Sequence, residues 1–177
     1  KANGHKAFAV LIDPDKLTPE SLLETIQLAK QANVDYLFVG GSLVVTDTLD
    51  KVVAAIATSA GKTVVFCDTK RLCDRVTEHL QDLGINALAI HGDLTQAARE
   101  KAIVRFTNNE LLVLVATDVA ARGIDIDDVA VVIHYVPPID SKTYLHRSGR
   151  TARAGRDGWA VTLAEYNQHT TCRIIQR

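Results

Sequence analysis

The sequence predicts an α/β protein with a three-layer, doubly wound architecture, in which helices cover both faces of one open, mainly parallel sheet of about seven strands. Two observations carry this prediction. Short runs rich in Val, Ile, Leu and Phe are continuously apolar, which is typical of strands buried on both faces. Amphipathic segments with helical periodicity separate these runs. The runs lie at 7–12, 36–39, 64–67, 87–90, 111–116, 129–134 and 160–163.

The segment 19–32 shows most clearly why the intervening elements should be helices. Thr18 can cap the N-terminus, Pro19 fits the first helical position, and aliphatic side chains repeat on one face. Gly84 is expected to stop a later helix. Further helices are predicted at 46–57, 70–83, 95–107, 141–148 and 165–176. Strand and helix therefore alternate, as the right-handed crossovers of a parallel sheet require.

The chain length favours an open sheet over a closed one. A barrel of eight strand–helix units takes roughly 250 residues, whereas this chain has 177. An open sheet is therefore the prediction, and a closed, barrel-like sheet is the alternative. No Pro/Gly/Ser-rich linker interrupts the sequence, so residues 1–177 are expected to pack as a single domain.

The composition indicates a soluble, globular protein. Lys and Arg total 20 against 21 Asp and Glu, and 47% of the residues are hydrophobic, which excludes a disordered polyelectrolyte. No apolar run approaches the roughly 18 residues of a membrane span, so no membrane partner is expected. Cys67, Cys73 and Cys172 form neither a disulfide framework nor a metal-ligand pattern. We therefore expect a reducing, cytosolic setting and no cofactor or metal.

The charges are unevenly distributed along the chain. Residues 1–57 hold five Lys, no Arg and seven acidic residues, which gives a net charge of −2. Residues 58–177 hold eleven Arg and four Lys against fourteen acidic residues, which gives +1. This asymmetry indicates that the character of the chain changes near residue 58.

The densest candidate for chemistry is the segment from Tyr144 to Arg156. It contains two glycines that allow tight turns and close approach of the backbone to a ligand. Its arginines recur every third residue, an array that suits bidentate recognition of phosphates. A solvated basic face with surface ion pairs is the alternative interpretation. The cations of this region are Lys142, Arg147, Arg150, Arg153 and Arg156.

A second candidate follows the predicted strand 111–116. Thr117, Asp118 and Arg122 should lie at or just beyond its carboxyl end, where ligands of open α/β sheets bind. A helix cap by Thr117 or Asp118 is the alternative. Residues 91–93 and 67–70 follow two other strands and should lie along the same edge.

These segments resemble the second RecA-like domain of DEAD-box RNA helicases. The resemblance is carried, in order, by VVFCDTK (64–70), HGDLTQAAR (91–99), ATDVAARGIDI (116–126) and HRSGRTARAG (146–155). It implies that Arg150 and Arg153 act as arginine fingers on the ATP γ-phosphate, that Asp125 contacts the nucleotide ribose, and that His146 joins an interdomain network. The residues to which it assigns RNA contacts are Gly92, Arg99, Thr117 and Arg147.

The first RecA-like domain of that family supplies a phosphate loop, the Asp-Glu-Ala-Asp motif and the Ser-Ala-Thr motif, and this sequence contains none of them. The segment 59–63 has a Gly-Lys-Thr, but it lacks the upstream glycine of a phosphate loop and precedes a strand. Arginine fingers need the Mg²⁺ and γ-phosphate that those motifs hold. We therefore expect no ATP hydrolysis by this chain alone, and expect it not to be an enzyme.

The first part of the chain resembles a different family. Residues 5–16, which include LIDPDK, and residues 34–42, which end in GGS, are similar to the first βαβα segment of the geranylgeranylglyceryl phosphate synthase family of TIM barrels. That resemblance places Asp13 and Ser42 near a Mg²⁺ ion. The other barrel units are missing, so both residues are expected to be turn and cap residues without a metal.

The leading hypothesis is therefore an engineered chimera without an intact active site, in which a barrel-derived segment (1–57) extends the sheet of a helicase-derived segment (58–177), as a test of fold compatibility. The alternative is a module with weak affinity for single-stranded RNA, nucleotide or phosphate. Neither hypothesis requires a partner. The chain is expected to be a monomer, with a dimer through edge strands as the alternative.

Overall fold

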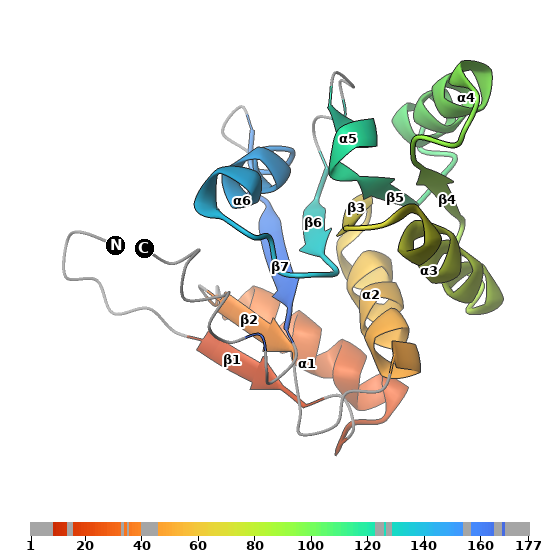
Figure 1. Cartoon of the computed structure of the whole chain (residues 1–177). Helices are drawn as coiled ribbons and strands as arrows, with labels where there is room; N and C mark the ends of the chain where they lie inside the picture. The colour runs from red at the N-terminus through yellow and green to blue at the C-terminus, as the bar shows by residue number, and fades with distance from the viewer. Residues whose placement is uncertain are drawn as a thin grey trace.

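The computed structural model describes residues 9–13, 16–32, 34, 36–39, 46–122, 126, 129–153, 157–164 and 168. Within these residues, strands and helices alternate along the chain (Figure 1). The strands are β1 (Ala9–Ile12), β2 (Tyr36–Val39), β3 (Thr63–Cys67), β4 (Ala87–Ile90), β5 (Val113–Thr117), β6 (Val131–His134) and β7 (Trp159–Leu163). The helices are α1 (Pro19–Gln31), α2 (Thr46–Ala60), α3 (Lys70–Asp82), α4 (Gln96–Thr107), α5 (Asp118–Ala121) and α6 (Ser141–Ser148).

The strands form one seven-stranded sheet in the order β1-β2-β7-β6-β3-β5-β4, and every neighbouring pair is parallel. Figure 1 shows β1 and β4 at opposite edges. The prediction of an open parallel α/β sheet is therefore confirmed, and the closed, barrel-like alternative is wrong. The closed form fails because the two edge strands do not pair with each other.

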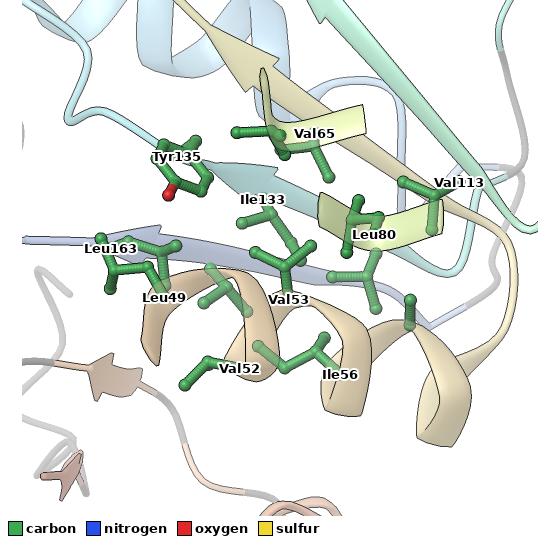
Figure 2. Close-up of a cluster of buried hydrophobic side chains, with 14 of the residues drawn as sticks. Leu49, Val52, Val53, Ile56, Val65, Leu80, Val113, Ile133, Tyr135 and Leu163 are labelled. Carbon is green, nitrogen blue, oxygen red and sulfur yellow. The ribbon is translucent and has the colours of Figure 1, made fainter. Parts of the chain in front are cut away.

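The hydrophobic core divides into two layers, one on each face of the sheet. Alternate residues of a strand point to opposite faces, so Val65 of β3 packs with α2 and α3, whereas Val64 and Phe66 pack with α4 and α5. Figure 2 shows the first layer, in which Val53 and Ile56 of α2 lie against side chains from the strands. Helices on both faces confirm the doubly wound architecture.

Side-chain caps explain where several helices begin. The hydroxyls of Thr18, Thr69 and Thr95 each accept a hydrogen bond from the backbone N–H three residues later, which satisfies a donor that the first turn leaves free. Thr18 and Pro19 start α1 as the sequence predicted. The helix predicted at 165–176 lies outside the described residues except for Gln168. No described helix is long and apolar enough to cross a membrane.

Candidate phosphate-binding site

A pocket of about 350 Å³ opens at the carboxyl end of the central strands, between α5 and α6. Phe66 of β3 lines it together with residues of both helices and of the segment that follows α6. This is the edge of an open parallel sheet at which ligands bind. The lining residues are Phe66, Asp118, Ala121, Arg122, Thr143, Leu145, His146, Arg147, Gly149, Arg150 and Arg153.

Three arginines give the pocket its cationic character. Arg122 follows α5 directly and is exposed, and Arg150 and Arg153 follow α6. Arg153 Nε donates to the carbonyl oxygen of Gly149, which ties this side chain to the end of the helix. Arginines from two separate segments thus line one cavity. Such an arrangement suits an anion with several oxygens, because each guanidinium can bind two of them.

Arg147 also lines the pocket, but its guanidinium is bonded inside the protein. Nε and Nη2 donate to the two carboxylate oxygens of Asp118 at 2.7 and 2.6 Å, and Nη1 donates to the carbonyl oxygen of Val136 at 3.2 Å. The residue is 4% exposed, and its guanidinium lies 5.4 Å from the centre of the Phe66 ring. This bidentate ion pair fastens α6 to α5, the two helices that form the walls of the pocket.

Arg99 and Thr117, to which the helicase resemblance assigns RNA contacts, both hydrogen-bond to the backbone of Ala120 in α5. Thr117 ends β5, is buried, and accepts a hydrogen bond from the Ala120 N–H at 3.4 Å. Arg99, on α4, donates to the carbonyl oxygens of Ala120 and, at 3.5 Å, of Arg122. The structure therefore brings these two residues together beside the pocket, and Arg99 stabilises the turn that presents Arg122.

Gly92 lies two residues beyond the end of β4, outside the pocket lining. Beside it, His91 Nε2 is 2.8 Å from an oxygen of Asp74, and Lys70 pairs with Asp93. The hydrogen bond and the charge of Lys70 lower the pKa of Asp93, although burial opposes this shift. A polar surface thus follows β4 along the same edge of the sheet.

The structure describes one of the two positions that the barrel resemblance places near a Mg²⁺ ion. Asp13 follows β1, at the far edge of the sheet from β4, and pairs with Lys16 at 2.8 Å. Ser42 and Asp125 lie outside the described residues, as does Arg156. Among the residues that the structure describes, no group of three or more His, Cys, Asp or Glu side chains could hold a metal ion.

Sequence reasoning missed several residues of the pocket. Phe66, Thr143 and Leu145 line it, yet Phe66 reads as an ordinary strand residue and the other two as ordinary positions of a short helix. The helical spacing of Thr143 from His146 and Arg147 was the available signal, because residues three and four apart share a helix face. For Phe66 the sequence contains no such signal.

The fold is that of a RecA-like α/β domain, and an arginine-lined pocket lies at the carboxyl ends of its parallel strands. Residues 45–155 match the family described as the helicase conserved C-terminal domain. This match covers more than half of the chain, and the chain belongs to that family.

Curated relatives and solved structures agree with this assignment. The chain is 45% identical over 112 residues to the ATP-dependent RNA helicase DbpA of Escherichia coli, which is 63% of this chain and 24% of DbpA. It is 51% identical over 115 residues to CshA of Limosilactobacillus reuteri, which is 65% of this chain and 23% of CshA. The chain therefore spans about a quarter of the length of these relatives.

Among solved structures, the C-terminal domain of the DEAD-box protein Dbp5 matches with a TM-score of 0.70 and 31% identity, over 80% of this chain and 82% of that one. The E. coli DEAD-box protein SrmB, solved with the regulator of ribonuclease activity A, matches with a TM-score of 0.64 and 32% identity, over 97% of this chain and 85% of that one. The resemblance to a DEAD-box C-terminal domain is thus confirmed.

The family match also bears on the predicted boundary near residue 58. It begins at residue 45 and therefore includes α2, which the sequence interpretation assigned to the barrel-like segment 1–57. The comparisons favour the helicase-module hypothesis over the chimera hypothesis, and the barrel-derived origin of residues 1–57 stays a prediction.

Proposed function

We propose that this domain binds the phosphate groups of a nucleotide in the pocket between α5 and α6, and a single-stranded RNA backbone along the neighbouring strand ends. The observation that carries the proposal is the convergence of Arg122, Arg150 and Arg153 on one pocket. In the resemblance to DEAD-box helicases, Arg150 and Arg153 meet the γ-phosphate and Asp125 meets the ribose.

The charge balance of the pocket supports an anionic ligand. The carboxylate of Asp118 is engaged by Arg147 through two short hydrogen bonds, so this acidic group is compensated within the protein. Among the lining residues that the structure describes, the other charged side chains are those of Arg122, Arg150 and Arg153. The positive field of these arginines favours an anionic ligand such as a phosphate.

For RNA, the proposal relies on Gly92, Arg99 and Thr117, which lie on neighbouring strand ends and on α4. Gly92 offers an exposed backbone for close approach of a phosphate. The RNA contact of Arg147 stays a prediction; in this conformation its guanidinium is bonded to Asp118 and Val136. We propose that the chain binds these ligands without hydrolysing ATP, since Mg²⁺ and the attacking water need the motifs of a first domain.

A titration of the whole chain with ATP and with single-stranded RNA at low salt tests the proposal. The double variant Arg150→Ala/Arg153→Ala should weaken ATP binding at least ten-fold, because two charge-assisted contacts are lost. Lys142→Ala is the matched control, since Lys142 is an exposed cation of α6 outside the pocket lining. An equal effect of the control, or no saturable binding by the unmodified chain, would refute the pocket as a phosphate site.

We also propose, as a finer point of architecture, that residues 1–57 derive from a barrel-type βαβα segment grafted onto this domain. The sheet order supports it, because β1 and β2 lie together at one edge of the sheet, where β2 pairs with β7. Titration with Mg²⁺ and a prenyl diphosphate should then give no saturable binding, as most of the parent site would be missing. Saturable binding that Asp13→Ala abolishes would contradict a purely structural graft.

A further inference from the structure

His134, the last residue of β6, is a buried imidazole that contacts the helix beside the pocket. Its exposed fraction is 0%. Nε2 lies 3.4 Å from the hydroxyl of Ser148, and Nδ1 lies 3.3 Å from the hydroxyl of Thr162 on β7. The ring also packs edge-on against Tyr144, with centroids 5.0 Å apart. Two of these three contacts reach α6.

The contact with Ser148 lies at the end of α6, directly before the segment that carries Arg150 and Arg153. Ser148 is the last residue of α6, and Gly149 caps the helix by donating its N–H to Leu145 O at 2.8 Å. Arg150 follows directly, and its N–H donates to Arg147 O at 3.2 Å. The position of Ser148 against the sheet therefore sets the path of the chain into the pocket.

We propose that His134 is a positioning residue that holds the C-terminal end of α6 against β6 and β7, and thereby sets where Arg150 and Arg153 enter the pocket. The consequence for ligand binding rests on the proposed function, whereas the structural role does not.

The imidazole suits this role because it stays neutral. Burial is the main cause that lowers the pKa of His134 to about 3; the Arg147 cation lowers it further, and Asp118 opposes the shift. The neutral ring has one N–H donor and one nitrogen acceptor, and each hydroxyl can donate or accept. Both contacts can therefore be satisfied in either tautomer.

Two amide substitutions separate the contact with α6 from the contact with β7. The side-chain amide of His134→Gln reaches the position of Nε2 and can keep the hydrogen bond to Ser148. The shorter amide of His134→Asn reaches only the position of Nδ1, on the side of Thr162. His134→Leu keeps the volume but removes both hydrogen bonds. Val132→Ala is the matched control, since Val132 lies on the same face of β6 and packs in the core under α4 and α5.

The experiment measures the affinity of each full-length variant for inorganic tripolyphosphate, and hydrogen exchange at the amides of Gly149 and Arg150. We expect His134→Leu and His134→Asn to lose about ten-fold in affinity and to exchange faster at both amides. His134→Gln should restore affinity and protection, and Val132→Ala should change neither. If His134→Leu does not fold, Ser148→Ala removes the same contact from the side of α6 and should reproduce the loss.

Three results would overturn the proposal: equal behaviour of the Gln and Asn variants, a loss in Val132→Ala as large as that in His134→Leu, or unchanged exchange in Ser148→Ala. If the unmodified chain does not bind tripolyphosphate, the proposed function fails. Hydrogen exchange at Gly149 and Arg150 would then still decide the role of His134.

Discussion

Near the carboxyl end of β6, each face of the sheet has a cluster of buried charged side chains, and the two clusters differ in their partners. On the face of α2 and α3, the carboxylate of Asp50 is 1% exposed and accepts from Tyr135 Oη at 2.9 Å, with His79 Nδ1 at 2.6 Å and Arg75 at 3.6 Å. On the other face, Arg147 pairs with Asp118.

The residue pair 135–136 links the two arrangements. The hydroxyl of Tyr135 donates to Asp50, while the carbonyl oxygen of Val136 accepts from Arg147 on the opposite face. Around Asp50 the donors surround one carboxylate, and its contacts with His79 and Arg75 hold α2 against α3. Around Asp118 the ion pair joins two helices and leaves three further arginines lining a cavity. The first cluster therefore fastens two helices together, whereas the second also forms a wall of the proposed phosphate site.

The largest expected effect comes from a charge placed in the sheet itself, which both faces share. Leu114 is the second residue of β5 and is fully buried. The change Leu114→Asp places an unpaired carboxylate in the core, which costs several kcal/mol, of the order of the whole stability. We expect a chain without a cooperative unfolding transition in circular dichroism. A soluble variant that unfolds cooperatively would show that β5 is wrongly assigned; the same holds for charges at Val65 or Val132.

The next largest effect concerns the ion pair under the pocket. The change Asp118→Asn leaves the buried guanidinium of Arg147 without its carboxylate and should lower the free energy of unfolding by about 3 kcal/mol. That figure is at the low end for such pairs because Asp118 is 31% exposed. Tripolyphosphate affinity should fall as well, since α5 and α6 lose their connection. Urea unfolding and titration of one sample measure both quantities. A loss of stability with unchanged affinity would show that the ion pair does not shape the pocket.

The corresponding change on the opposite face is Asp50→Asn. The amide can still accept from Tyr135, but its NH₂ group faces the donors of His79 or Arg75, so we expect a loss of about 2 kcal/mol. Because this cluster serves packing alone, the affinity for tripolyphosphate should stay within two-fold of the unmodified chain. A ten-fold loss of affinity would mean that the two faces are coupled through residues 135 and 136.

A pH series measures the contribution of His134. Its pKa is about 3 in the folded chain, against 6.5 for an unperturbed histidine, so the unfolded state takes up the proton first as the pH falls. This contribution to stability is complete above about pH 6.5 and is lost at about 1.4 kcal/mol per pH unit between there and pH 3. The stability of His134→Gln should fall less steeply in urea unfolding at pH 7, 6, 5 and 4. Parallel slopes would show that folding does not shift the pKa of His134.

The smallest effect on stability should come from the pocket itself. Arg122 is exposed, so Arg122→Ala should change the free energy of unfolding by less than about 0.5 kcal/mol. Loss of one guanidinium should nevertheless weaken tripolyphosphate binding by about ten-fold. If the variant binds tripolyphosphate as well as the unmodified chain does, Arg122 does not contact the ligand.

The sequence predicted the fold well because its signals are local. Continuous apolar runs such as 64–67 and helix starts such as Thr18–Pro19 depend on neighbouring residues, and the alternation of strands and helices then restricts the topology. The strand order could not be predicted, since it depends on contacts such as that of β2 with β7, which are remote in the sequence.

For the site, the sequence placed Thr117 at the carboxyl end of a strand, as the structure has it, while the ligand contacts of Thr117, Arg150 and Arg153 stay predictions. The motifs could not show that Arg147 is bonded to Asp118, because charge runs look the same whether they are buried or exposed. Nor could the motifs show that Phe66 lines the pocket or that His134 contacts Ser148. Both contacts join a strand to α6, and α6 follows these strands in the sequence.

The most direct test of the account follows the side-chain Nε–Hε resonances of individual arginines by NMR while inorganic tripolyphosphate is added to the full chain. We expect shifts at Arg122, Arg150 and Arg153, which line the pocket, and no shift at Arg75 beside Asp50 on the opposite face. Shifts confined to Arg75, or equal shifts at all four arginines, would contradict a phosphate site between α5 and α6.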